Sequence, residues 1–312
     1  KSYQLKPMNC PFHIIIYMSK LRSYKDLPIR WAEIGTVYRY EKAGVLHGLL
    51  RVRGFTQDDA HIFCTPGQLE EEICKIIDLV YFFLSNFGFN EYRVFLSTRP
   101  TNFVGTIENW GKATNALENA LKSKNIKYEI DPGEGVFYGP KIDIKIKDCI
   151  GREWQCSTIQ IDFNIPEKFE IKYIDSDGKF KTPIMIHRAI LGSFERFFGI
   201  LIEHYKGNFP FWLAPEQIRI LPIAERHNAF SLELKSKLGK NFRTGIDLRN
   251  EKINKKIKDA EEEKVPYMII IGDREIKEKK LSLREHKVGI IGSFTFEEII
   301  EKFCKEIEKI KY

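Results

Sequence analysis

Residues 51–63 read R-V-R-G-F-T-Q-D-D-A-H-I-F, a run that is too polar for a buried strand but alternates with the period of one. At a period of two residues, one face of such a strand collects cations, an aromatic ring, an amide, a carboxylate and an imidazole. The members of this face are Arg51, Arg53, Phe55, Gln57, Asp59 and His61. These groups could hold a small zwitterion beside a phosphate, although a solvated strand face would give the same pattern.

The run before it, residues 35–41, alternates as well and places Arg39 and Glu41 on the same side. Residues 42–50 lie between the two runs and contain two glycines, so we predict a long hairpin. The rest of the chain before Pro210 has long β-like runs and a few helices that do not alternate regularly. This pattern predicts an antiparallel sheet with helices packed on it.

Two further segments of this part carry clear local signals. A helix is predicted from its cap at Thr65 to Asn86. A β-like run over residues 183–191 contains His187 and Arg188 and leads through a glycine into a helical pattern. A strand that feeds a helix through glycine commonly faces a ligand, but a core histidine and a surface arginine explain this segment equally well.

A domain boundary is predicted where P-F-W-L-A-P, residues 210–215, places two prolines around an apolar tether. We expect one domain over residues 1–212 and a second over residues 213–312. In the second, short β-rich runs alternate with amphipathic stretches, which predicts a small α/β domain with a largely parallel sheet. The predicted strands are residues 218–223, 244–248, 267–271 and 281–284, and the predicted helices are residues 228–238 and 250–263. A closing helix is expected after Thr295, which fits a capping box with Glu298.

The composition is that of a folded globular protein, because 43% of the 312 residues are hydrophobic and only 13 are proline. The longest apolar runs, residues 79–84 and 197–202, are far shorter than the roughly 18 residues that a bilayer crossing needs, so no membrane partner is expected. A net charge of +7 permits a polyanionic partner without demonstrating one. The six cysteines form no C-x-x-C pair, which favours reduced thiols and a cytoplasmic location, with an organelle as the alternative.

Short-range spacing gives no metal signature, because Cys10, His61 and His187 lie far apart in the sequence. A small buried hydrophobe would explain the cysteine, and hydrogen-bonded strand residues would explain the two histidines. Spacing alone therefore gives no reason to expect that the three meet.

Ordered blocks along almost the whole chain closely resemble the threonyl-tRNA synthetases, which are class II enzymes. In the first domain the blocks are K-P-M-N-C-P at residues 6–11, the hairpin segment at residues 38–64, Y-G-P-K-I-D at residues 138–143, Q-I-D-F-N-I-P at residues 160–166 and H-R-A-I-L-G-S-F-E-R at residues 187–196. The match continues through W-L-A-P, residues 212–215, into D-L-R-N-E-K-I at residues 247–253 and V-P-Y-M-I at residues 265–269. The resemblance implies an α+β class II synthetase fold, an antiparallel sheet with flanking helices, followed by a smaller α/β anticodon-binding domain.

The resemblance also implies a threonine–tRNA ligase, which activates threonine with ATP and transfers it to tRNA(Thr). It implies one catalytic Zn²⁺ per chain, held by Cys10, His61 and His187, with open positions for the amino and hydroxyl groups of threonine. Asp59 would accept the hydroxyl hydrogen. Gln57 and Tyr138 would hold the amino group. The remaining positions matched to the threonine pocket are Met8, Gln160 and Ser193.

For ATP, which enters with Mg²⁺, the resemblance places Arg39 at the α-phosphate and Arg196 where it stacks on the nucleotide. Glu41 would lie near the adenine and Arg51 near the γ-phosphate, and Lys141 is expected to be a third catalytic cation. Activation needs alignment and charge neutralisation but no protein base, because the carboxylate of threonine itself attacks the α-phosphate. The other residues matched to the ATP site are Phe55 and Gln155.

The sequence departs from the family at two positions. Phe12 stands where the family usually has glycine, which predicts a tighter wall beside Cys10. Lys264 stands where an arginine is often found, and a lysine is a point charge without the planar fork that reads a base. The positions matched to anticodon contacts are Asn250, Lys264, Glu275 and Arg284.

The chain begins just before the first block, so we expect a fragment that lacks motif 1, much of the dimer interface and the editing modules of the family. The full-length protein is expected to be a homodimer. One alternative is a synthetase-like protein that binds tRNA or mRNA without aminoacylating it, and the intact metal and arginine set argues against it. The other is a class II synthetase for proline, serine or glycine, from which zinc content would distinguish this chain.

Overall fold

The computed structural model describes residues 1–308 and 310, and the contacts among them form two compact units. The first unit comprises residues 1–201 and the second begins at Ile202. The division falls within helix α5 (Phe194–Tyr205), whereas the predicted boundary between residues 212 and 213 lies further along the chain. Every helix among the described residues is too short or too polar to span a bilayer.

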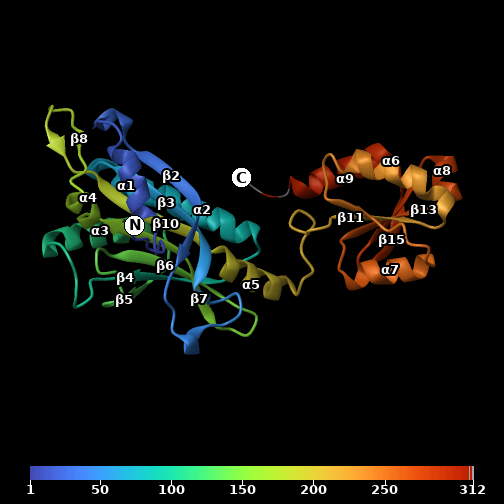
Figure 1. Ribbon diagram of the computed structural model, residues 1–312, viewed down its shortest axis with the longest axis horizontal. Helices are drawn as coiled ribbons and strands as arrows, with labels where there is room; N and C mark the ends of the chain where they lie inside the picture. Colours follow the sequence, from blue (N-terminus) through green and yellow to red (C-terminus); the bar gives the residue numbers. More distant parts are fainter. Residues whose placement is uncertain (309, 311–312) are drawn as a thin grey trace. The chain divides into compact units, whose positions relative to one another are not determined.

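A seven-stranded sheet forms the centre of the first unit, in the order β2-β3-β10-β7-β6-β4-β5 (Figure 1). Its strands are β2 (Ile29–Tyr38), β3 (Gly54–Cys64), β4 (Tyr92–Ser97), β5 (Glu129–Asp131), β6 (Lys141–Lys147), β7 (Glu153–Asp162) and β10 (Ile184–Ser193). All neighbouring strands are antiparallel except β4 and β5. The predicted antiparallel sheet and the hairpin that joins β2 to β3 are confirmed.

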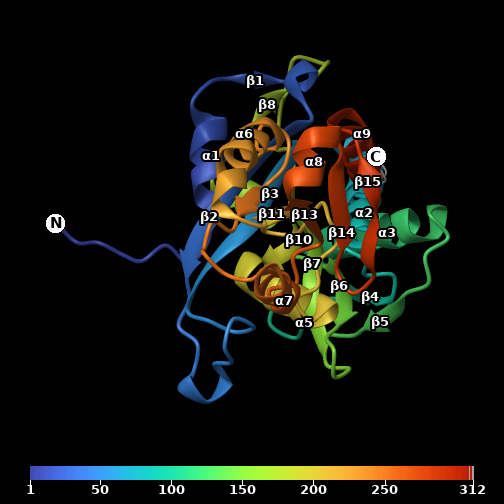
Figure 2. The same cartoon turned by 90° about the vertical axis from the view of Figure 1, so that its right-hand side faces the viewer.

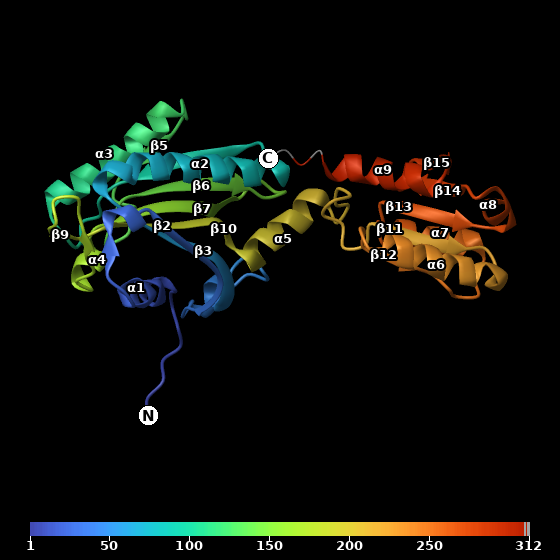
Figure 3. The same ribbon diagram turned by 90° about the horizontal axis from the view of Figure 1, so that it is seen from above.

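Helices cover both faces of this sheet (Figure 3). Helices α2 (Leu69–Asn86) and α3 (Ile107–Ser123) pack together against one face, and α1 (Cys10–Met18) lies on the other. Successive strand residues point to opposite faces, so Phe63 packs with α1 whereas its neighbour Ile62 faces α2. The same alternation leaves His61 on the α1 face.

Local signals in the sequence set the limits of α2. The Thr65 N–H donates to Gln68 Oε1 at 3.0 Å, but residues 66–68 form a 3-10 turn, η3, and the α-helix starts at Leu69. Gly88, just past the end, has a φ of 82°, a left-handed conformation that favours glycine. The predicted helix is confirmed, with a tighter first turn than expected.

The remaining elements of the first unit are short, except for the helix that follows β10. The short ones are η1 (Tyr24–Asp26), η2 (Ala43–Val45), α4 (Asn164–Lys168) and the small sheet of β1 (Arg22–Ser23), β8 (Tyr173–Ile174) and β9 (Phe180–Lys181). Strand β10 leads directly into α5, as the strand–glycine–helix pattern predicted.

The second unit contains a five-stranded sheet in the order β12-β11-β13-β14-β15. Figure 2 labels its strands β11, β13, β14 and β15. Its strands are β11 (Ile218–Pro222), β12 (Thr244–Ile246), β13 (Tyr267–Ile271), β14 (Leu281–Glu285) and β15 (Gly289–Phe294). Strand β11 is parallel to β12 and β13, but β14 is antiparallel to both β13 and β15. The prediction of a largely parallel sheet is therefore wrong for β14, because residues 272–280, which join it to β13, are fewer than a parallel crossover needs. A tight turn with Lys287 at a φ of 61° then folds the additional strand β15 back along β14.

Helices pack on both faces of the second sheet. They are α6 (Asn228–Leu238), α7 (Ile253–Glu262), α8 (Asp273–Glu278) and α9 (Phe296–Ile307), with a 3-10 turn, η4 (Glu225–His227), before α6. Helices α6 and α9 share one core cluster, in which the Phe211 and Phe303 rings stack with centroids 4.7 Å apart. Helix α7 packs in a separate cluster with Leu221 and Met268. The predicted helices α6, α7 and α9 are confirmed, and the Thr295 Oγ1 accepts from the Glu298 N–H as expected.

Candidate functional site

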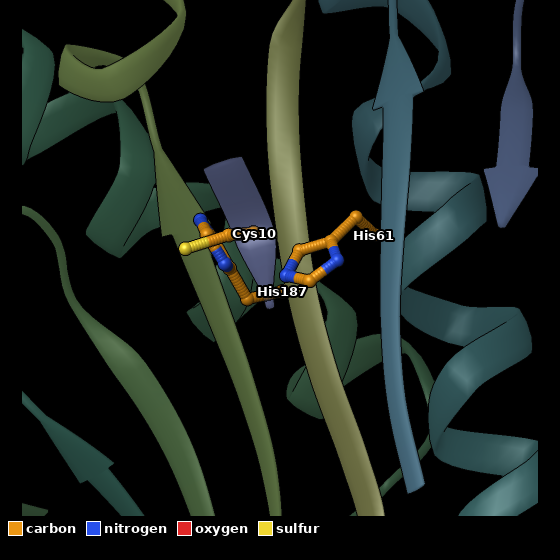
Figure 4. A group of neighbouring side chains, drawn as sticks. All are labelled: Cys10, His61 and His187. Carbon is orange, nitrogen blue, oxygen red and sulfur yellow. The ribbon is translucent and has the colours of Figure 1, made fainter. Parts of the chain in front are cut away.

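Three residues that are far apart in the sequence meet on the α1 face of the first sheet (Figure 4). Cys10 begins α1, His61 lies on β3, and His187 is its register partner on the neighbouring strand β10. One ligand atom from each residue lies within 4.8 Å of the other two, and all three side chains are buried. The antiparallel pairing of β3 with β10 is what brings the two histidines together.

Asn9 and Gly35 set the distance between α1 and the sheet. The Asn9 Nδ2 donates to Asp59 Oδ2 at 3.1 Å, which ties the start of the helix to β3. Gly35 on β2 leaves room for this side chain, because a Cβ there would lie 2.6 Å from Asn9 Nδ2. Glycine at this position therefore lets α1 come close enough for Cys10 to reach the histidines.

The donor set of this group fits zinc. One sulfur and two imidazole nitrogens are ligands that Zn²⁺ prefers, and three protein ligands leave a position open for a substrate. Burial lowers the pKa of His61 well below its usual range, so the imidazole stays neutral. Burial, together with the carboxylates of Asp59 and Asp162, raises the pKa of the Cys10 thiol to about 12, so a metal must displace a proton from it.

Each histidine of the group also has a partner on its second ring nitrogen. His187 Nε2 lies 3.0 Å from Asp162 Oδ2, and His61 Nδ1 lies 2.7 Å from His13 Nδ1. Metal-binding histidines usually donate this second N–H, which fixes the ring orientation. The sequence analysis did not identify His13 or Asp162. The spacing C-x-x-H between Cys10 and His13, on one face of a helix, is the signal that points to the former.

A cavity of about 410 Å³ adjoins Cys10, His61 and His187, which are called the metal group below. It is lined by almost every residue that the resemblance places around threonine and ATP. These residues are Met8, Arg39, Glu41, Arg51, Phe55, Gln57, Asp59, Tyr138, Gln155, Gln160, Ser193 and Arg196. Lys141 is absent from the lining, and its Nζ lies 2.6 Å from Asp143 Oδ2. Arg53 is absent too, so the predicted strand face is wrong there: β3 begins only at Gly54, and the Arg53 Nε donates to the Glu41 carbonyl.

Two arginines of the lining are held by backbone carbonyls. The Arg196 Nε donates to the Leu50 carbonyl at 2.9 Å, and the Arg39 Nε donates to the Pro7 carbonyl at 3.0 Å. The Arg39 guanidinium also lies 5.3 Å from the centre of the Phe55 ring. Cations fixed in this way can stabilise charge that develops on phosphoryl oxygens without reorganising during the reaction.

Polar side chains surround the part of the cavity next to the metal group. The Tyr138 hydroxyl donates to Gln160 Oε1 at 2.5 Å, and its ring centre lies 5.4 Å from that of His187. Burial raises the pKa of Tyr138, so the phenol keeps its proton. An Asp59 carboxylate oxygen lies 3.5 Å from His61 Nε2. This arrangement can hold a small molecule that carries an amino group and a hydroxyl.

A partly buried carboxylate that the sequence analysis missed shapes the end of β10. Asp58 accepts hydrogen bonds from the backbone N–H groups of Ile190, Leu191 and Gly192 at 2.6, 3.1 and 2.9 Å. The strand bulges here, and Gly192 has a φ of 80° with the Cys156 carbonyl too close for a Cβ. Asp58 thus fixes the backbone that leads into α5 and its arginine. No local pattern marks it, because its partners are backbone groups of a distant strand.

Phe12 does not narrow the cavity as predicted. Its side chain is 50% exposed and is absent from the cavity lining, and the Lys6 Nζ lies 5.5 Å from its ring centre. Phe12 points away because α1 directs Cys10 and His13 toward the sheet, so that Phe12 falls on another face of the helix.

The residues matched to anticodon contacts are spread over the second unit. Asn250 is exposed before α7, and the Lys264 Nζ donates to the Lys206 carbonyl. The Glu275 carboxylate accepts from the Gly272 N–H, and the Arg284 Nε donates to Glu261 Oε1 at 3.2 Å. Within the described part of the chain, none of the four matched side chains forms a hydrogen bond or ion pair with another.

Comparison with known families matches each unit to a different domain. Residues 1–205 match the tRNA synthetase class II core domain (G, H, P, S and T), and residues 217–306 match the anticodon binding domain. The threonine–tRNA ligase of Caldanaerobacter subterraneus subsp. tengcongensis is 55% identical over 308 residues, which are 98% of this chain and 48% of that protein. That of Nitrosococcus oceani is 52% identical over 309 residues, again 48% of that protein. The chain thus spans about half the length of the curated relatives it matches.

Solved structures show the same likeness in three dimensions. The RNA binding domain of threonyl-tRNA synthetase from Cryptosporidium parvum superposes with a TM-score of 0.92 at 41% identity, covering 96% of this chain and 76% of that one. A putative threonyl-tRNA synthetase from Aeropyrum pernix superposes with a TM-score of 0.79 at 30% identity, covering 98% of this chain and 75% of that one. The similarity therefore extends through both units.

Proposed function

Because the chain belongs to the threonyl-tRNA synthetase family of class II aminoacyl-tRNA synthetases, we propose that it acts as a threonine–tRNA ligase. It activates threonine with ATP to threonyl-adenylate and transfers the threonyl group to tRNA(Thr). The observation that carries the proposal is the convergence of Cys10, His61 and His187 beside a cavity that also presents Arg39 and Arg196. The metal group would bind the amino acid, and the two fixed arginines would bind the nucleotide phosphate on which it is activated.

In this proposal Cys10, His61 and His187 hold one Zn²⁺ per chain. When bound there, Zn²⁺ would supply a Lewis-acid position for the amino and hydroxyl groups of threonine. Asp59 accepts the hydroxyl hydrogen, and its position 3.5 Å from His61 Nε2 supports this role. The residues proposed to hold the remaining groups of threonine are Met8, Gln57, Tyr138, Gln160 and Ser193.

Activation needs alignment and neutralisation of charge. A carboxylate oxygen of threonine attacks the α-phosphorus of ATP, and the bond from that phosphorus to the pyrophosphate oxygen breaks. Arg39 and Arg196 stabilise the charge that grows on the phosphoryl oxygens, and Mg²⁺ accompanies the nucleotide. The other proposed ATP contacts are Glu41, Arg51, Phe55 and Gln155. Lys141 contributes as a third cation, which requires its ammonium to leave Asp143 when ATP binds.

The second unit is proposed to bind the anticodon of tRNA(Thr) through Asn250, Glu275 and Arg284, with the functional boundary at residues 212 and 213. Lys264 is the weakest of the matched contacts, because its ammonium already donates to the Lys206 carbonyl. We also propose that the whole protein is a cytoplasmic homodimer. Exposed apolar side chains on α1 support the dimer. They are Ile15, Ile16 and Met18. Apolar surface that is left exposed in this way commonly marks an interaction site.

Amino acid selection tests the proposal most directly, through exchange of labelled pyrophosphate into ATP by the zinc-loaded chain. Threonine should support exchange. Valine, which has no hydroxyl, should be activated about 10⁴-fold less efficiently or worse, because the polar groups of the pocket would be left unpaired. Serine lacks only a methyl group and should lose roughly 10- to 200-fold. Equal activation of valine and serine would contradict the proposed pocket, and activation of proline in place of threonine would identify another member of the class.

Metal content tests the ligand set in the same samples. The parent chain should retain about one zinc, as three protein ligands predict. Cys10→Ser should remove it, whereas Cys64→Ser is the matched control, because Cys64 is also buried in the first unit but lies outside the metal group. Zinc retained by Cys10→Ser at the parent stoichiometry would contradict the assignment. Tight tRNA binding without exchange would favour the non-aminoacylating alternative.

A further inference from the structure

We propose that His13 and Glu33 form a chain of polar contacts that positions His61 as a metal ligand, a role that rests on the proposed zinc site. Both act through His61 and are positioning residues. His13 lies on α1, three residues after Cys10, so one helix supplies both a ligand and the partner of a second ligand. Glu33 lies on β2, next to β3.

The geometry leaves only one nitrogen of His61 for the metal. His61 Nδ1 lies 2.7 Å from His13 Nδ1, and the two rings stand at 77° to each other with centroids 4.9 Å apart. Both side chains are buried, His61 at 1% and His13 at 5% exposure, so water does not compete for this contact. The other nitrogen, on the far side of the His61 ring, points toward Cys10 and His187 (Figure 4).

A metal on His61 Nε2 fixes the direction of the whole chain. Nε2 then has no proton, so the neutral ring carries its hydrogen on Nδ1 and donates it to His13 Nδ1. His13 must in turn carry its hydrogen on Nε2, and Glu33 Oε1 lies 3.5 Å from that nitrogen, where its negative charge favours this tautomer. Without the metal the chain can run in reverse, because Asp59 Oδ1 lies 3.5 Å from His61 Nε2.

The second histidine of the site shows why a chain is needed for the first. His187 Nε2 reaches the Asp162 carboxylate directly at 3.0 Å. His61 turns its second nitrogen toward His13 on α1, and the carboxylate of Glu33 on β2 lies 3.5 Å from the other nitrogen of the His13 ring. His13 therefore extends to His61 the carboxylate contact that His187 makes by itself, and loss of such a partner typically weakens metal binding 10- to 100-fold.

Two substitutions of His13 separate positioning from packing. His13→Asn places an amide oxygen near the position of Nδ1 and can still accept from His61, whereas His13→Leu fills the space and accepts nothing. We expect His13→Leu to weaken Zn²⁺ binding about 10- to 100-fold in competition with a chromogenic chelator, and His13→Asn to keep most of the affinity. Glu33→Leu, at the partly exposed end of the chain, should also weaken binding, by a smaller factor.

The control is His227→Leu, which removes a buried histidine of the second unit and should leave zinc affinity unchanged. A cooperative thermal unfolding transition, followed by circular dichroism, shows that each metal-free variant is folded before it is titrated with Zn²⁺. Equal affinities for His13→Leu and the parent would overturn the proposal, as would equal losses in His13→Leu and His13→Asn. In both cases the parent still binds zinc and the proposed ligase site stands, whereas a parent chain that binds no zinc would overturn both.

Discussion

The cavity of the first unit is already assembled in the protein without its ligands, whereas the anticodon-matched residues of the second unit do not form one site. In the first unit, residues from the chain before α1, from β3, β7 and β10 and from α5 converge on one cavity. In the second, the matched side chains already have partners within the protein or are exposed, as with Arg284 on Glu261 and Asn250 in its loop.

This difference follows from the size of what each site is proposed to bind. A small amino acid and a nucleotide must be aligned to a fraction of an ångström, so their contacts have to be fixed beforehand. An RNA loop presents bases over a wide surface, and contacts to it can form one by one as the RNA docks. Substitutions in the cavity should therefore have large effects on the chemistry, and those in the second unit smaller effects on tRNA alone.

The largest expected effect is at the two fixed arginines. Arg39→Ala and Arg196→Ala should each lower threonine-dependent pyrophosphate exchange about a hundredfold or more, because each removes a cation aimed at the transition state. Arg93→Ala is the matched control, since Arg93 also lies in the first unit but pairs with Glu129 away from the cavity. Near-normal exchange in either cavity variant would mean that the substituted arginine does not contribute to activation, although it lines the cavity.

Asp58→Asn should have the next largest effect. The substitution keeps the shape but turns an N–H donor toward at least one of the three backbone N–H groups that the carboxylate accepts. The bulge before α5 should shift and carry Arg196 with it, and a displacement of this kind can cost about 10- to 100-fold in rate. A fall in kcat for exchange with little change in zinc content would separate this role from the metal site. Parent-like kinetics would show that the bulge is held by other contacts.

Local sequence patterns predicted which residues share one face of a strand better than they predicted contacts between residues far apart in the sequence. Alternation along residues 55–61 placed Phe55, Gln57, Asp59 and His61 on one face, and all four line the cavity. The meeting of His61 with His187 depends on the register of two distant strands, which no spacing reveals, so only the family resemblance pointed to it. The same reason hid the partners Asn9 and Asp58, whereas the C-x-x-H spacing after Cys10 is a local signal for His13. Strand β15 was missed because its glycines weaken the strand pattern.

In the second unit, Arg284→Ala should lower the rate of tRNA charging at limiting tRNA and leave pyrophosphate exchange unchanged, because activation needs no tRNA. A lost base contact typically costs about 1 to 3 kcal/mol, or roughly 5- to 150-fold. Arg226→Ala is the control, since Arg226 is an exposed arginine of the same unit that pairs with Asp273. Equal losses of charging and exchange would show that the two units are coupled and would remove the contrast between them.

The smallest effect is expected at Lys264, where the ammonium is already committed. Lys264 has a φ of 59° and its Nζ donates to the Lys206 carbonyl, so the side chain serves the fold of its own unit. A lysine that neutralises a phosphate adds about 0.7 to 0.9 to the slope of log affinity against log salt concentration. Lys264→Met should therefore leave that slope for tRNA(Thr) unchanged, measured by filter binding over a range of salt, with Arg284→Ala tested in parallel. A slope reduced by nearly one for Lys264→Met would mean that the ammonium leaves the Lys206 carbonyl to bind the RNA. A side chain with a partner in the free protein would then still serve as an RNA contact.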